Sequence, residues 1–290
     1  TLTINFGATL DLNGYNLTAE TLVNNGNLQL HGGNLTAETL VQGNNGNLQL
    51  QGGETVVITT MDTDSGNVTY DGTGTYTQLA AGDAYYNLTL NSSGSIRLDA
   101  NLDVNGDLTI TNGTLDVSTD DHSINVAGDW TNNDTFISQE GTVTFDGSPT
   151  VITGGVADTN DFHHVILSGS GTTEQSTNDI DIDGNFTISS SGTWDTKGFC
   201  IFFSNTTTLT LGSGTLINPI PTLSSSSPTD GATGVVGTAN IVLTFSEAVD
   251  VESGNIVIKK TSDDSTVETI AVPNSNVTVT GTPEITINPT

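Results

Sequence analysis

Three aspartates with one residue between each pair form the run with the clearest potential for ligand chemistry. Asp179, Asp181 and Asp183 stand in Asp-Ile-Asp-Ile-Asp-Gly, the spacing with which calcium-binding loops begin. The position that supplies a bidentate glutamate in such loops falls on Ser190, and the isoleucines alternate as they do in a strand. We favour a solvated strand with an acidic outer face, and the alternative is a weak calcium site at the three aspartates.

Residues that could carry catalysis are sparse and scattered. His163 and His164 are adjacent, so on a strand they would point to opposite faces and could not bind one metal ion together. Asp120 and Asp121 are adjacent in the same way, whereas glycoside hydrolysis needs convergent carboxylates. Cys200 is the only cysteine and stands in an apolar run, which predicts a packed strand. We expect no catalytic residues, no required cofactor and no enzymatic activity.

The charge balance excludes several classes of partner. The 290 residues include four basic and 33 acidic side chains, for a formal net charge of −29. A basic patch, which nucleic acids and anionic membrane surfaces require, cannot form. No apolar run approaches the roughly 20 residues that span a bilayer. We therefore expect neither nucleic-acid binding nor membrane insertion, and the acidity favours solubility and the attraction of cations.

Near-identical repeats set the architecture that must position these side chains. Asn16–Val23 returns letter for letter as Asn34–Val41, and Asn25–Leu30 returns in the same way as Asn45–Leu50. Both offsets are close to a period of roughly 20 residues, which in strand-like sequence is typical of a solenoid whose coils stack on one another.

Short alternating segments fill the chain up to residue 218. They alternate apolar and polar positions and are separated by Gly or Asn-Gly. Asn-Gly pairs also favour hairpins, so an array of β-sandwiches is the alternative. Repeat units of roughly 20 residues are too short to be separate domains. We predict an all-β fold with a right-handed parallel β-helix over residues 1–218, in which Thr18–Leu22 is the fragment with the most helical character.

A second, longer repeat overlies the short one. Gly141–Gly147 echoes Gly66–Gly72, and Phe162–Leu167 echoes Tyr85–Leu90. The two offsets are nearly equal, and each is three to four times the shorter period. We interpret this unit as three or four coils that were duplicated together as a stack.

Stacked coils place equivalent asparagines above one another. Asn16 with Asn34, and Asn25 with Asn45, are expected to form ladders at equivalent turns. Their side-chain amides would satisfy backbone groups of the turns through hydrogen bonds. We assign these residues a structural role.

The composition changes after residue 218. Residues 219–223 predict a stiff, proline-containing linker. Strand candidates then follow at intervals of roughly 10 residues, which is typical of a small β-sandwich. The stretches Pro228–Val235 and Ile241–Asp250 resemble those of bacterial Ig-like domains of surface proteins. The resemblance implies an Ig-like β-sandwich over residues 224–290 that lacks one or two final strands.

The repeats of residues 66–217 are similar to those of large bacterial surface and adhesin-like proteins with β-helical stalks. The residues that carry this resemblance include Leu102–Ile110, Ala127–Asn132 and Val143–Ser148. It implies an exported protein at the cell surface or in a filament.

Strand edges at the ends of such a chain would lack partners and invite assembly. The expected edge residues are Thr1, Leu2, Thr3 and Ile4 at one end and Ile285, Thr286 and Ile287 at the other. The sequence thus predicts a structural extracellular protein, an adhesin stalk or filament subunit, whose partners are its own copies or neighbouring segments. The alternative is a β-helix that binds or degrades a glycan.

Overall fold

The fold is all-β and comprises two compact units. The structure is a computed structural model that describes residues 1–148, 150–154, 162–189, 191–203, 208–217, 222–246, 249, 254–272, 275–279 and 283–289. Unit 1 comprises Thr1–Lys197 and Ile201–Ile217, and unit 2 comprises Gly198–Cys200 and Asn218–Thr290. No helix occurs in the described ranges.

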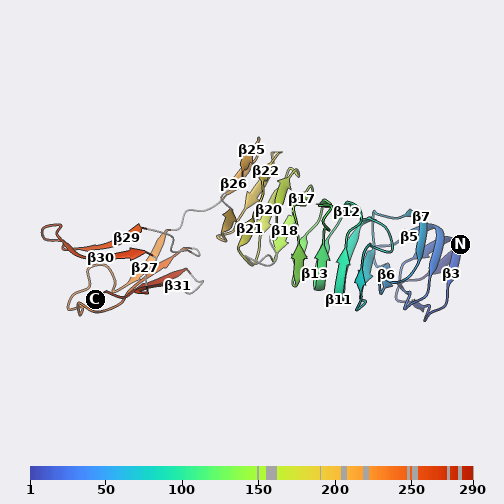
Figure 1. Cartoon of the computed structure of the whole chain (residues 1–290), viewed down its shortest axis with the longest axis horizontal. Coiled ribbons are helices and arrows are strands. Elements are labelled where there is room, and N and C mark those ends of the chain that lie inside the picture. The colour runs from blue at the N-terminus through green and yellow to red at the C-terminus, as the bar shows by residue number, and fades with distance from the viewer. Residues whose placement is uncertain are drawn as a thin grey trace. The chain divides into compact units, whose positions relative to one another are not determined.

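Unit 1 is a parallel β-solenoid of about ten coils (Figure 1). One sheet, here called the long sheet, runs through it and has 13 strands. These are β2 (Thr9–Asp11), β4 (Asn27–Gln29), β6 (Asn47–Leu50), β8 (Asn67–Tyr70), β9 (Thr75–Tyr76), β11 (Asn87–Arg97), β13 (Leu108–Asp116), β15 (Trp130–Asn132), β16 (Thr135–Ile137), β18 (Thr150–Thr153), β20 (Thr172–Gln175), β23 (Thr193–Asp195) and β26 (Thr215–Ile217).

Three further sheets complete the coils of the solenoid. The four-stranded sheet comprises β1 (Leu2–Ile4), β3 (Leu17–Asn24), β5 (Leu35–Gln42) and β7 (Val56–Met61). The seven-stranded sheet comprises β10 (Ala84–Tyr85), β12 (Leu102–Val104), β14 (Ile124–Val126), β17 (Thr142–Phe145), β19 (His164–Leu167), β22 (Phe186–Ile188) and β25 (Leu209–Leu211). A two-stranded sheet pairs β21 (Ile180–Ile182) with β24 (Ile201–Phe203).

The register of the sheets reproduces the sequence repeats. Leu17 pairs with Leu35 and Leu28 pairs with Leu48, so both letter-for-letter repeats lie directly above one another. Every strand pair of the solenoid is parallel, which confirms the coil stack over the alternative of hairpins. The fragment Thr18–Leu22, which had the most helical character in sequence, is extended and lies in β3.

The Asn-Gly pairs serve coil turns instead of hairpins. Gly26 and Gly46 stand in equivalent turns, one coil apart, and the N–H of Asn47 donates to the carbonyl oxygen of Gly26 at 2.8 Å. A Cβ at Gly46 would collide with the carbonyl oxygen of Asn24. Glycine is needed here because adjacent turns approach at backbone contact distance.

The core of the solenoid is a column of inward side chains. Leu28, Leu48, Leu88 and Leu108 are fully buried at equivalent positions of the long sheet. From β15 onward aromatic rings fill a larger share of the interior; the ring centroids of Trp130 and Phe136 lie 5.0 Å apart. Edge-to-face packing of this kind adds stability beyond the area that it buries.

The longer repeat does not correspond to a whole number of coils. Val68 in β8 aligns coil by coil with Leu88, Leu108 and Trp130, all in the long sheet. Its echo Val143 lies in β17, which belongs to the seven-stranded sheet. The interpretation as a duplicated stack of complete coils is therefore wrong. Short strands with inward apolar residues look alike in sequence on every side of a solenoid.

Unit 2 contains two antiparallel sheets. The four-stranded sheet has the order β27 (Leu223–Ser227), β28 (Ile241–Phe245), β32 (Glu284–Ile287), β31 (Val277–Val279), and the other sheet pairs β29 (Gly254–Lys259) with β30 (Thr266–Val272). Ile270, Val277 and Ile287 form a core between them. Leu223, placed in the linker by sequence, begins β27, and residues 219–221 of that linker lie outside the described residues.

Burial in the column predicts which leucines stabilise the solenoid. Leu108→Ala should lower the free energy of unfolding by about 2–5 kcal/mol, because it leaves a cavity in a tightly packed interior. Leu211→Ala, at a side chain that is 47 % exposed, should cost much less. Urea unfolding of both variants followed by circular dichroism measures the difference. Equal losses would contradict the assignment of Leu108 to the core.

Candidate functional site

Asparagines at one corner of the first coils link successive turns through their side chains. Oδ1 of Asn16 accepts a hydrogen bond from the N–H of Asn34 at 3.1 Å, and Oδ1 of Asn34 accepts one from the N–H of Thr55 at 2.8 Å. Each side chain thus satisfies a backbone N–H group of the next coil. These N–H groups belong to residues that directly precede strands and are not part of the strand pairing.

Asn25 and Asn45 do not stack on one another as the sequence predicted. The Asn25 side chain lies against Gly43, so the register of this turn is shifted. The neighbouring residues carry the ladder instead: Asn24 Nδ2 donates to Gln42 Oε1 at 3.1 Å in the buried interior. The repeat is longer between Asn25 and Asn45 than between Asn16 and Asn34, and this insertion displaces the equivalence.

A longer ladder on the outer face of the long sheet escaped sequence reasoning. Asn47 Nδ2 donates to Asn27 Oδ1, and Asn67 Nδ2 donates to Asn47 Oδ1, each at 3.3 Å. A parallel column lies beside it, in which Gln29 Nε2 donates to Gln49 Oε1 at 2.8 Å. The sequence did contain a sign of this ladder, because Asn27 and Asn47 lie within the repeated hexapeptide. That both side chains point outward and lie above one another follows only from the pairing of the strands.

Farther along the same column, aspartates accept hydrogen bonds from backbone N–H groups of the next coil, as Asn16 and Asn34 do at their corner. Asn87 Oδ1 accepts from the N–H of Asp107, Asp107 Oδ1 from the N–H of Asp129, and Asp129 Oδ1 from the N–H of Val151, each at 2.8 Å. We call Asn87, Asp107, Asp129 and Val151 the turn ladder.

In the seven-stranded sheet, His164 has the same role. Its Nδ1 accepts a hydrogen bond from the backbone N–H of Asn185, on the next coil, at 2.8 Å.

The aspartates of the predicted calcium site fall on a strand and its flanks. Asp181 is outward in β21 between buried Ile180 and Ile182, and Asp179 and Asp183 stand directly before and after the strand. Within the described ranges, no group of three or more His, Cys, Asp or Glu side chains is placed to hold a metal ion. Calcium binding therefore remains a prediction, and Ser190 lies outside the described residues.

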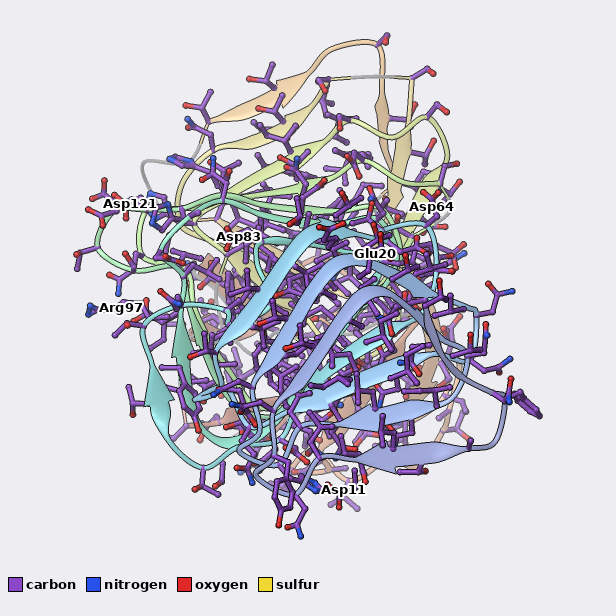
Figure 2. All side chains as sticks on the ribbon, turned by 90° about the vertical axis from the view of Figure 1, so that its right-hand side faces the viewer. Asp11, Glu20, Asp64, Asp83, Arg97 and Asp121 are labelled. Carbon is purple, nitrogen blue, oxygen red and sulfur yellow. The ribbon has the colours of Figure 1, made fainter. Side chains whose placement is uncertain are left out.

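The remaining candidates for chemistry occupy separate places. The rings of His163 and His164 make an edge contact with centroids 4.4 Å apart, so they do not point to opposite faces as expected, because His163 lies in a bend before β19. Cys200 precedes β24 and is half-buried instead of lying within a packed strand. Asp11, Asp64, Asp83 and Asp121 lie at separate points around the coils (Figure 2).

Like charges sit close together on the outside of the solenoid. Burial, followed by the proximity of Asp99, raises the pKa of Asp83, and burial with Asp103 nearby raises the pKa of Asp146. Glu174 and Asp195 are cross-strand partners, and Lys197 Nζ bridges them at 2.7 and 3.0 Å. The chain thus uses one of its few cations to offset repulsion between coils.

Both ends of the solenoid present strand edges. The edge residues Leu2, Thr3 and Ile4 form β1, at the edge of the four-stranded sheet, and Thr1 directly precedes it. At the other end, β24, β25 and β26 are the last strands of their sheets. The exposed large apolar side chains of these last strands are Phe203, Leu209, Leu211 and Ile217.

The predicted edge in unit 2 is wrong. Ile285, Thr286 and Ile287 lie in β32, which pairs with β28 on one side and with β31 on the other. Position late in the sequence suggested an edge, but the antiparallel topology inserts this strand between two earlier ones. The outer strands of that sheet are β27 and β31.

Comparison with known proteins identifies unit 2. Residues 218–290 match the family of bacterial Ig-like domains. No curated protein and no solved structure matches the chain. In the described part of the chain, no helix is long and apolar enough to cross a membrane. A β-solenoid followed by a bacterial Ig-like domain suggests a structural protein of the surface type.

The turn ladder predicts a difference between two substitutions of one residue. Asp107→Ala removes the acceptor of the Asp129 N–H and should lower the free energy of unfolding by about 1 kcal/mol. Asp107→Asn keeps Oδ1 and removes one of two neighbouring negative charges, so its stability should equal or exceed that of the parent protein. Urea unfolding at low ionic strength compares the three proteins. Equal destabilisation by both variants would contradict the ladder.

His164 predicts a pH dependence of stability. Burial, followed by the neighbouring His163, lowers the pKa of His164 below its usual value of 6.5. The unfolded chain therefore takes up this proton first, so stability is complete above pH 6.5 and is lost as the pH falls through the lowered pKa. His164→Asn keeps an acceptor that does not titrate, so its thermal stability relative to the parent should rise as the medium becomes more acidic. Parallel profiles of the two proteins would refute this role.

Proposed function

We propose that this chain is a rod segment of an extracellular structural protein, an adhesin stalk or filament subunit, with no catalytic role. Further β-coils would stack on the terminal coils of its solenoid, supplied by neighbouring segments of the same protein or by other copies. The observation that carries this proposal is the low charge of those terminal coils in a chain of net charge −29.

The distribution of acidic residues separates the ends of the solenoid from its middle. Residues 99–146 contain ten Asp and Glu, whereas residues 198–217 contain no charged side chain and residues 1–15 contain Asp11 alone. Closely apposed like charges cost free energy, so two acidic surfaces resist stacking. The two end coils can come together without that cost.

Apolar exposure at the same coils supports the proposal. Phe203, Leu209, Leu211 and Ile217 are each between 40 % and 47 % exposed on the last strands of the solenoid. Another coil on these strands would bury Phe203, Leu209 and Leu211, which stand above buried residues of the preceding coil, and would satisfy the backbone groups of the strand edges. Because such a contact joins two different surfaces head to tail, it produces linear arrays.

The proposed localisation follows from the Ig-like domain. Domains of this family are typical of bacterial surface proteins. The acidity of the chain suits an exterior whose salt or divalent cations screen self-repulsion. Calcium would act in this setting as a diffuse counterion or at the aspartates of β21, and the proposal requires neither.

Substitution at the last coil tests the stacking. Leu211→Lys places a charge on the proposed interface and should shift the concentration at which linear oligomers form at least tenfold upward. Val41→Lys, at a side chain that is 38 % exposed on the outer face of β5, is the matched control and should leave association unchanged. Sedimentation velocity over a concentration series, with electron microscopy of the oligomers, measures both.

Two results would contradict head-to-tail stacking. The first is a parent protein that remains monomeric at every concentration and ionic strength tested, which would show that its copies do not associate. Alternatively, Val41→Lys could reduce association as strongly as Leu211→Lys, which would move the contact to the side of the rod.

A further inference from the structure

An aromatic ring and several amides line a hollow on the first coils. The hollow has a volume of about 250 Å³, and its lining includes Phe6, Thr9, Asn27, Asn45 and Asn47. Phe6 is 75 % exposed although it is one of the largest apolar side chains of the coil. No charged residue lines this hollow.

The amides of the hollow are the open end of the ladder on the long sheet. Asn27 Oδ1 accepts a hydrogen bond from Asn47 Nδ2, and Asn47 Oδ1 accepts one from Asn67 Nδ2. The ladder therefore ends in the Nδ2 group of Asn27, whose two donors have no acceptor within residues 1–148. Asn45, beside it, brings another amide with both donor and acceptor capacity.

An uncharged polar surface continues from the hollow along the rod. Two outward columns of the long sheet provide it, and we call this surface the amide platform. Its members are Asn27, Asn47, Asn67, Asn87, Gln29, Gln49, Thr69 and Thr89. Hydroxyls join the network, since Thr69 Oγ1 donates to Asn47 Oδ1 at 2.9 Å. The platform displays both donors and acceptors on every coil.

We propose that the hollow and the amide platform bind a neutral oligosaccharide. Carboxamides and hydroxyls match the mixed donor and acceptor hydroxyls of a sugar, and the face of Phe6 offers its negative quadrupole to polarised C–H groups. Acidic glycans and nucleic acids would meet a chain of net charge −29, with Asp11 and Asp71 bordering the platform. A neutral sugar meets no such repulsion, and its hydroxyls can donate to these carboxylates.

The repeat of the platform favours a polymer over a single sugar. Successive coils lie about 4.8 Å apart, so a glycan chain along the axis meets an equivalent pair of side chains at each coil. Phe6 and the free donors of Asn27 stand at one end of this track and would hold the terminal sugar. Each further coil of the platform would add similar weak contacts, so the affinity should rise with the length of the glycan.

Glycan binding to the complete chain tests the proposal. The probes are neutral hexasaccharides of glucose, mannose and N-acetylglucosamine, with hexagalacturonate as the acidic counterpart, measured by isothermal titration calorimetry and saturation-transfer NMR. At least one neutral hexasaccharide should bind more tightly than its disaccharide, and hexagalacturonate should not bind. Failure of all three neutral sugars at millimolar concentration, or preference for the acidic one, would overturn the proposal.

Two matched pairs of variants locate the site. Phe6→Ala should weaken binding at least tenfold, whereas Tyr15→Ala should not, because Tyr15 is equally exposed at 77 % in the first coil but lies outside the hollow. Asn45→Asp should weaken binding several-fold because it removes the side-chain N–H donors of this residue from the hollow. Asn133→Asp adds the same charge at an exposed position of a distant coil and should have no effect. Equal effects within either pair would refute the site.

The readouts distinguish this inference from the stalk proposal. Leu211→Lys, on the last coil, lies outside the hollow, so it should reduce self-association and leave sugar binding unchanged. Conversely, a monomeric chain can still bind a glycan along one face. A glycan-binding face would define what a stalk of this kind adheres to.

Discussion

Parallel pairing of each coil with the coils on either side is the interaction on which the whole solenoid depends. A β-strand satisfies its backbone donors and acceptors only through neighbours, so each interior coil of unit 1 pairs with the coil before it and the coil after it. This requirement places Leu28 above Leu48 and keeps the same side chains inward at every level. It also forces glycines such as Gly46 into turns, where stacked backbones leave no room for a Cβ.

The turns carry a second level of the same constraint. Strand pairing stops at each corner, and there an Asn or Asp side chain accepts the N–H that the ladder leaves over, as Asn16, Asn87 and Asp107 do. Aspartate serves as well as asparagine in this role, because only Oδ1 is used. The chain can therefore accumulate negative charge at its corners without losing turn stability, and the cost is mutual repulsion along the rod.

Charge distribution then separates what different surfaces of the rod can do. The middle of the solenoid is acidic and resists contact with other anionic surfaces. The last coil is uncharged and apolar, and the amide platform is uncharged and polar. We propose that the last coil stacks with further coils of the same fold and that the amide platform binds hydroxylated ligands. These surfaces differ in composition although they are built from the same strand repeat.

Several features of this fold could be read from the sequence because they depend on local periodicity. The identical octapeptides of Asn16 and Asn34 predicted stacked coils, alternation predicted the inward faces, and Pro228–Val235 indicated the Ig-like domain. Other features depend on which residues face each other across coils. The displaced pair Asn25 and Asn45, the contact between His163 and His164 and the interior position of β32 followed from register and topology.

The sequence by itself determined that this protein is a repeating β-structure with a strongly acidic surface, since both properties reside in period and composition. Only the tertiary structure decided which polar side chains form columns, and that the longer echo moves from the long sheet to another. The physical reason is that a strand repeat specifies inward and outward faces through strict alternation of side chains. It does not specify on which side of the coil a segment lies, and that depends on the summed length of all preceding turns.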